Sequence, residues 1–214
     1  MTTFTEYFQI HKNQAELDFV DIPVDSDIPL FIDPFAISQR PDNWSHNCHR
    51  TIVSFFQNLI NCIRNDADSQ AYQMLRFLKE PNETRFGFSR GRPQGAGVGS
   101  FQAAQILEAL RASEAFRTGF LNSLGECELM IVGVGRDKIS DLTTNLIRFH
   151  LANYTLSQCQ LWNIPVRQMP LPPFYNAQSG EWNTTYFDLP MTSTGPALCV
   201  RVVVASIEQK SLQF

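Results

Sequence analysis

A loop rich in glycine and arginine contains the residues best suited to binding an anion. It reads Ser-Arg-Gly-Arg-Pro-Gln-Gly-Ala-Gly-Val-Gly over 89–99 and leads into an expected helix at Ser100. Glycines permit positive φ angles, so successive amides can converge on an anion, and a helix N-terminus adds partial positive charge. We predict that phosphate is bound here by Arg85, Arg90, Arg92, Gly95, Gly97 and Gly99. The alternative is a surface loop whose glycines serve only its turns, because the Gly-Lys-Ser/Thr ending of a Walker A loop is missing.

Three acidic residues are candidates for metal-assisted catalysis. Asp33 ends an apolar run, Glu83 lies in the turn before the Gly/Arg loop, and Asp137 follows the apolar run 128–134. Cleavage of a phosphodiester by two metal ions needs several carboxylates around ions about 3.5–4 Å apart. We predict that Asp33, Glu83 and Asp137 hold Mg²⁺ or Mn²⁺ and that Asp141 joins them as a catalytic residue.

Three polar residues share one face of a helix expected over about 141–158. Asp141, Asn145 and Arg148 fall at i, i+4 and i+7. The buried side is expected to carry other positions, namely Leu142, Leu146, Phe149 and Tyr154. Two interpretations stay open. The stripe either orients a bound phosphate, with Asn145 and Arg148 as ligands, or it is a solvent-exposed ladder of polar side chains.

Two further patterns receive less weight. His46, Cys48 and His49 have the chemistry of metal ligands, but their spacing suits local capping and packing better than a tetrahedral site. Asp188 followed by Glu208-x-Lys210 is similar to the acid-then-ExK arrangement of many restriction-type nucleases, although the second half falls in the last residues of the sequence.

Composition excludes several classes of protein. The net charge of -4 and pI near 5.5 argue against the broad electropositive face of a protein that coats nucleic acid. Five scattered cysteines without a CxxC pair indicate buried thiols in a reducing cytoplasm. The first residues show no pattern of a secretory signal, so none is expected. No stretch approaches the ~20 consecutive apolar residues that span a bilayer, so no membrane contact is expected.

Apolar spacing and turn residues predict a single domain over 1–214 with an α+β or α/β fold: a small mixed sheet with helices packed on at least one face. The expected helices are 3–9, 46–64, 70–79, a helix from Ser100 and 141–158. The expected strands are 17–24, 29–33, 84–89, 128–134, 184–189 and 198–207. The segment 165–214 is interpreted as a proline-rich loop followed by a β-like C-terminal stretch.

Three stretches resemble a family of uncharacterised bacterial proteins associated with mobile-element and phage-defence loci. They are LFIDP at 30–34, EPNETRFGFSRGRPQGAGVG at 80–99 and DKISDLTTNLIR at 137–148. The resemblance covers roughly 17–190 and implies a defence context. It also implies longer relatives, so that residues 197–214 would depart from the pattern as the end of a shortened member that retains binding alone.

The leading hypothesis is recognition of a nucleic acid or nucleotide, extending to metal-dependent cleavage by a nuclease. The alternative is a non-catalytic interaction subunit that docks on a protein encoded by a neighbouring gene, using its phenylalanines and the proline-rich segment. A third hypothesis is a sensor that binds a small nucleotide without cutting it.

Overall fold

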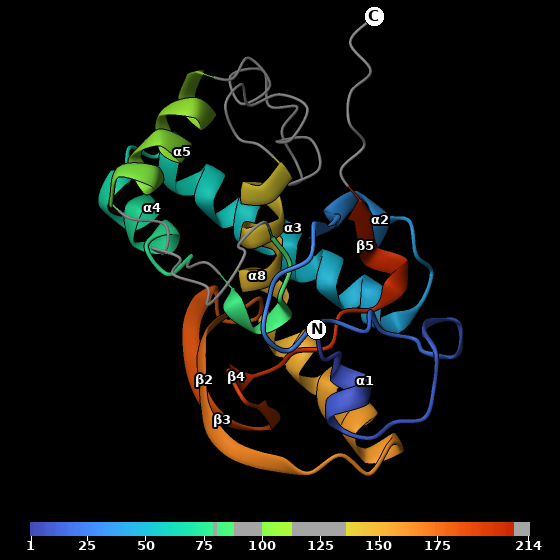
Figure 1. Ribbon diagram of the computed structural model, residues 1–214. Coiled ribbons are helices and arrows are strands. Elements are labelled where there is room, and N and C mark those ends of the chain that lie inside the picture. Colours follow the sequence, from blue (N-terminus) through green and yellow to red (C-terminus); the bar gives the residue numbers. More distant parts are fainter. Residues whose placement is uncertain (79–80, 88–99, 113–135, 208–214) are drawn as a thin grey trace, which may run out of the picture.

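The computed structural model describes residues 1–78, 81–87, 100–112 and 136–207. Helices and two small antiparallel sheets make up a mixed α+β fold, as the sequence predicts (Figure 1). The helices are α1 (Phe4–Tyr7), α2 (Pro34–Ser38), α3 (Asn43–Arg64), α4 (Asp68–Leu75), α5 (Ser100–Ala112) and α8 (Arg136–Leu161), with short 3₁₀ turns η1 (Gln14–Glu16), η2 (Asn82–Thr84) and η3 (Val202–Val204). The strands are β1 (Leu30–Ile32), β2 (Val166–Asn176), β3 (Glu181–Thr192), β4 (Gly195–Pro196) and β5 (Ala205–Ile207).

The helical hairpin predicted from apolar spacing is present as α3 and α4. Asp42 begins α3 by accepting a hydrogen bond from the backbone N–H of Ser45, which satisfies a donor that has no partner within the helix. The six apolar residues of α3 that the sequence predicts to share one face are all buried: Ile52, Phe55, Phe56, Leu59, Ile60 and Ile63. The face that the sequence predicts to be apolar is therefore the face that packs.

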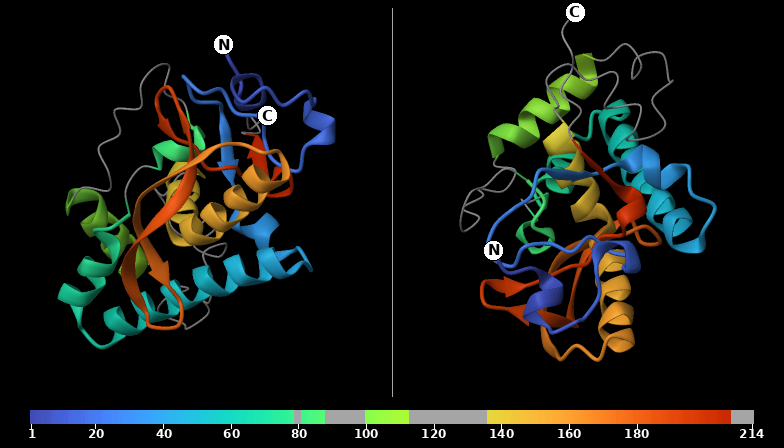
Figure 2. Two further views of the ribbon diagram at one scale, coloured as in Figure 1. Left: turned by 90° about the horizontal axis from the view of Figure 1, so that it is seen from below. Right: turned by 45° about the vertical axis from the view of Figure 1, so that its right-hand side comes forward.

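Helix α8 lies at the centre of the fold and is buried on more than one face. It contacts α3, β1, β2 and β3, and both views of Figure 2 show the β2–β3 hairpin alongside it. Leu142, Leu146 and Leu151 are buried, but so are Thr143, Thr144 and Thr155. Each of these threonines donates to the carbonyl four residues earlier, which allows a hydroxyl to be buried without losing its hydrogen bond.

The proline-rich segment is a strand, not the loop predicted from its composition. Strand β2 pairs with β3 over most of its length, and the register shifts between Leu171 and Phe174, where Pro172 and Pro173 lie. Within the described part of the chain, β2 is an edge of the sheet β2-β3-β4. Proline is tolerated at sheet edges and bulges, because its missing N–H removes no hydrogen bond between strands there. A loop predicted from proline content alone was therefore wrong for this segment.

The other predicted strands have mixed outcomes. Strand β1 lies within the expected 29–33 and pairs with β5, which ends the expected 198–207. The segment 17–24 and the described part of 84–89, up to residue 87, contain only isolated bridges, which join Phe19 to Arg201, Pro23 to Thr3 and Phe86 to Ile28. The 3₁₀ turn η2 begins just before the second segment. The expected strand 128–134 lies outside the described residues.

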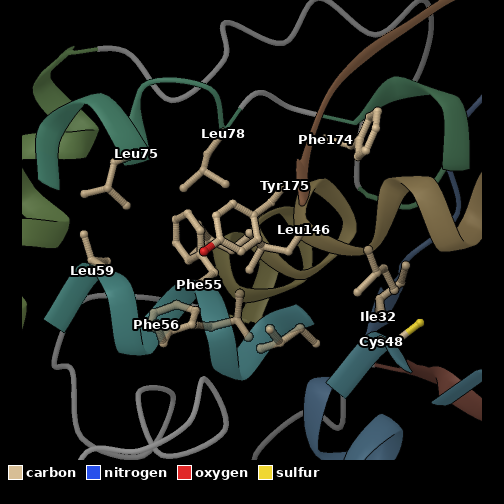
Figure 3. Close-up of a cluster of buried hydrophobic side chains, with 14 of the residues drawn as sticks. Ile32, Cys48, Phe55, Phe56, Leu59, Leu75, Leu78, Leu146, Phe174 and Tyr175 are labelled. Atoms are coloured by element: carbon tan, nitrogen blue, oxygen red, sulfur yellow. The ribbon is translucent and has the colours of Figure 1, made fainter. Parts of the chain in front are cut away.

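The main core forms where α3, α4, α8 and β2 meet. Phe55 of α3 lies beside Tyr175 of β2 and near Leu146 of α8, and Leu75 and Leu78 lie across from α3 (Figure 3). Phe56 and Leu59 belong to the same buried cluster. Tyr175 is buried, and the cost of burying its hydroxyl is offset by a hydrogen bond that the hydroxyl accepts from Asn58 Nδ2 at 2.7 Å. A second cluster joins α1 to the C-terminal half of α8 through Phe4, Phe19 and Tyr154.

One arginine connects three distant parts of this second cluster. Arg201 donates to Asp42 at 2.8 Å, and its Nε lies 3.6 Å from Asp18. Its guanidinium also lies over the rings of Trp44 and Tyr154, at 5.3 and 5.9 Å. Partial burial works to raise the pKa of Asp42, but hydrogen bonds from Ser45 and Arg201 outweigh it and hold that pKa below its ordinary value. Arg201 therefore fastens the C-terminal segment to α3, α8 and the N-terminal segment.

We predict that Arg201→Met lowers the free energy of unfolding by about 1–3 kcal/mol. The methionine keeps the apolar stem but loses both carboxylates and both ring contacts; the carboxylates are partly exposed, so water limits the loss. Urea unfolding measures the effect, with Arg40→Met at an exposed arginine as the control. Equal stabilities for the two variants would show that Arg201 is not a structural junction.

Candidate functional site

The candidate site lies where η2 and the residues after it approach the middle of α8. The backbone carbonyl of Glu83 accepts a hydrogen bond from Leu198 N–H at 2.8 Å, and that of Arg85 accepts one from Ile28 N–H at 2.9 Å. The segment 83–85 is thus held between the C-terminal and N-terminal parts of the chain.

Arg85 is a buried cation in an unusual backbone conformation. Its φ is 56°, in the left-handed region, which costs a non-glycine residue about 1–2 kcal/mol. The side chain is 4% exposed, and its Nη2 donates to Thr194 Oγ1 at 2.6 Å. Thr194 in turn donates to the carbonyl of Val24. The β3–β4 turn therefore holds one end of the guanidinium, and backbone strain of this kind is often found at functional sites.

Arg148, in the middle of α8, is more deeply buried. It is 2% exposed, and its Nη1 donates to the carbonyl of Pro173 at 2.8 Å. Its Nε is buried and has no hydrogen-bond partner. Burial lowers the pKa of Arg148, whereas the nearby charge of Glu83 works in the opposite direction. The guanidinium stays charged at neutral pH, because an arginine titrates far above that range.

Glu83 is the acidic member of the site. Its Oε2 is buried and also has no hydrogen-bond partner. Among the ion pairs between described residues, none includes Glu83, Arg85 or Arg148. Two guanidinium groups are therefore buried without an ion pair among the described residues, and the carboxylate of Glu83 lies near enough to Arg148 to act on its pKa. An anion would offset the cost of burying such charges.

The polar stripe predicted on α8 is not a solvent-exposed ladder. Asn145 is 0% exposed and Arg148 is 2% exposed, whereas Asp141 is half-buried. Asn145 Nδ2 donates to the carbonyl of Asp141 at 2.7 Å. The expectation that the stripe points away from the buried side is wrong for Asn145 and Arg148, because α8 packs against neighbours on several sides.

The acids predicted to hold a metal have separate local surroundings. Asp33 is the N-cap of α2 and accepts from the N–H groups of Phe35 and Ala36 at 2.8 and 3.3 Å. Asp137 is exposed in the first turn of α8. Across the described ranges no three His, Cys, Asp or Glu side chains are grouped to hold a metal ion, so Asp33, Glu83 and Asp137 do not form such a group. The same applies to His46, Cys48 and His49; Cys48 is buried, which raises the pKa of its thiol.

The Gly/Arg loop itself, with Arg90, Arg92, Gly95, Gly97 and Gly99, lies outside the described residues, as do Glu208 and Lys210. The structure adds two groups that sequence reasoning missed: the Thr194 hydroxyl and the Pro173 carbonyl. Thr194 lies 109 positions after the arginine it contacts. No local signal in a single sequence indicates such a pairing.

Comparison with known proteins gives one match. The family model described as a domain of unknown function (DUF8370) matches residues 9–200. No curated protein and no solved structure matches the chain. The matched region includes Glu83, Arg85 and Arg148 and all of the Gly/Arg loop.

We predict that Asp33 acts as a helix cap and not as a metal ligand. Asp33→Asn keeps a good N-cap and should leave the free energy of unfolding within about 0.5 kcal/mol of the original, while Asp33→Ala should lower it by about 1 kcal/mol. Urea unfolding with and without Mg²⁺ or Mn²⁺ makes the comparison. A stabilisation by either ion that Asp33→Asn abolishes would instead make Asp33 a ligand.

Proposed function

The chain belongs to the family described as a domain of unknown function (DUF8370). We propose that it binds a phosphate-bearing ligand, either a nucleotide or a nucleic acid. The proposal also includes the bacterial defence context and the cytoplasmic location that the resemblance and composition imply. Recognition of the ligand is the central claim, and cleavage is secondary to it.

The observation that carries the proposal is the pair of buried guanidinium groups without a carboxylate at ion-pair distance among the described residues. Arg85 and Arg148 are 4% and 2% exposed. A buried charge loses its hydration, and this loss is offset when an opposite charge or several hydrogen bonds replace the water. Guanidinium groups match phosphate oxygens in both charge and geometry. An anion is the partner that this arrangement favours.

The order of residues along the chain supports the same ligand. Arg85 precedes the Gly/Arg loop by a few residues, so the chain that leaves the buried site continues directly into Arg90 and Arg92. In this proposal Arg85, Arg90, Arg92 and the amides of Gly95, Gly97 and Gly99 bind phosphate. Asn145 and Arg148 on α8 orient the ligand.

Metal-dependent cleavage receives less support than binding. Glu83 lies near Arg148, but Asp33 caps α2 and Asp137 is exposed on α8. The docking alternative is not favoured either, because among the described phenylalanines that would supply an apolar face, Phe4, Phe19, Phe31, Phe55, Phe56 and Phe174 are buried. We therefore propose a binding protein first, and treat a Mg²⁺- or Mn²⁺-dependent nuclease as an outcome of the test.

We predict that nucleoside monophosphates or a single-stranded oligonucleotide raise the melting temperature of the protein in a concentration-dependent way. A ligand at a hundred times its Kd adds about 2.7 kcal/mol to stability. Arg92→Ala and Arg85→Met should each weaken binding about tenfold or more, a loss of about 1.4 kcal/mol. Arg40→Ala, at an exposed arginine of α2's C-terminal side, is the matched control and should bind normally.

Two results would change the account. If none of these ligands and no inorganic phosphate stabilises the protein, the proposed function is wrong. If the oligonucleotide is degraded in the presence of Mg²⁺ or Mn²⁺, and Asp137→Ala abolishes this, the chain is a nuclease and Asp137 acts in the reaction despite its exposed position.

A further inference from the structure

A histidine on α8 is joined to α3 by hydrogen bonds of its side chain and of its backbone. The Nε2 atom of His150 lies 2.9 Å from the hydroxyl of Thr51, a residue that is 4% exposed. That hydroxyl donates its hydrogen to the backbone carbonyl of Asn47, one turn earlier in α3, at 3.0 Å. The indole Nε1–H of Trp44, also on α3, donates to the backbone carbonyl of His150 at 3.1 Å. Two hydrogen bonds between α3 and α8 therefore meet at one residue.

The chemistry of these groups places the hydrogens. A hydroxyl has one hydrogen to donate, and a neutral imidazole has one N–H and one nitrogen that accepts. Because the hydrogen of Thr51 is directed at the carbonyl of Asn47, Thr51 accepts from the ring, and the hydrogen of neutral His150 is on Nε2. A proton taken up from water then goes to Nδ1 and turns the ring into a cation.

The surroundings of His150 oppose this positive charge. The residue is half-buried against α3, and burial lowers the pKa of its ring. The charge of Arg50, on α3, lowers that pKa further. The elements α2, β1, β2 and β3 also pack against α8, but none of their described residues brings a charge that acts on His150. Within the described ranges no carboxylate forms an ion pair with the ring, so the cation would find repulsion and no compensation.

We infer that His150 and Thr51 form an acid-sensitive joint between α3 and α8, which is stable while the imidazole is neutral and is weakened when the ring takes up a proton. The inference is independent of the proposed function. The joint lies on two helices whose apolar residues share the main core, among them Ile52 of α3 and Leu151 of α8. A weaker joint therefore acts on packing that holds most of the fold together.

The direction of the pH dependence follows from the two states of the chain. As the pH falls, the unfolded chain takes up the proton first, because its histidine is neither buried nor beside Arg50. The contribution of the joint to stability is therefore complete above the ordinary histidine pKa of about 6.5. It is lost as the pH falls below that value and through the lower pKa of the folded protein.

Urea unfolding of the full chain at about pH 7.5 and about pH 5 tests the joint. His150→Gln places an amide N–H at a reach similar to that of Nε2 and takes up no proton. We expect the urea midpoint of the unmodified protein to fall more between the two pH values than that of His150→Gln. Each pH unit between the folded and unfolded pKa is worth about tenfold in the folding equilibrium. His11→Gln, at an exposed histidine outside both helices, is the matched control and should lose as much as the unmodified protein.

One other histidine is excluded by the same design. Burial also lowers the pKa of His49, on α3, so its titration adds to the loss of stability in acid. His49 is present in all three proteins. The difference between the unmodified protein and His150→Gln therefore reports on the joint alone.

NMR titration of the His150 ring in the unmodified protein gives an independent reading. The ring should take up its proton at a lower pH in the folded protein than in the chain unfolded by urea. Equal losses of stability for the unmodified protein and His150→Gln, or a folded ring that titrates no lower than the unfolded one, would overturn the inference. Should His150→Gln not fold, as judged by circular dichroism, the NMR titration decides alone.

Discussion

The burial of polar side chains on α8 is the constraint on which the rest of the structure depends. Since much of α8 is buried, each polar group on its buried faces needs a partner inside the fold. Ser140 Oγ accepts from the N–H of Ile32 at 2.9 Å, Thr155 Oγ1 accepts from the N–H of Cys199 at 2.8 Å, and Arg148 donates to the carbonyl of Pro173. These bonds attach β1, the C-terminal segment and β2 to one helix. Segments with few backbone hydrogen bonds of their own, such as β1 and the stretch around Cys199, are thereby fixed in position.

The same constraint explains why the candidate site lies in the middle of α8. Arg148 serves β2 with one nitrogen and has another, Nε, that the described fold does not use. A leucine or methionine at this position would pack without the loss of hydration that a guanidinium incurs, so the arginine is an inefficient choice for stability alone. The carboxylate of Glu83 acts on its pKa, and in the proposed function Arg148 and the strained Arg85 both serve a bound ligand. A site of this kind favours function over stability.

Sequence reasoning recovered the helices better than the strands or the site, for physical reasons. The three- and four-residue spacing of apolar residues in α3 is a local signal. Helix α5, which begins at Ser100, and the long helix α8 were also predicted from local sequence signals. Strand β2 was missed because its prolines are permitted only by its place at a sheet edge, which is a property of the assembled sheet. Arg85, Glu83 and Arg148 were selected for their chemistry, but the burial of Arg148 was not foreseen, since it depends on the neighbours that pack on several sides of α8. Asp33 was also selected for its chemistry, as a metal ligand, but the structure shows it as the N-cap of the next helix, α2.

The central claim is that Arg148 serves a bound phosphate-bearing ligand, and NMR of arginine Nε–Hε groups tests it most directly. Arg148→Lys identifies the resonance by its disappearance. The account predicts a signal protected from exchange with water in the free protein, and a shift of that signal when a nucleoside monophosphate is added. A resonance that stays unchanged at saturation, while signals elsewhere in the protein move, would contradict it.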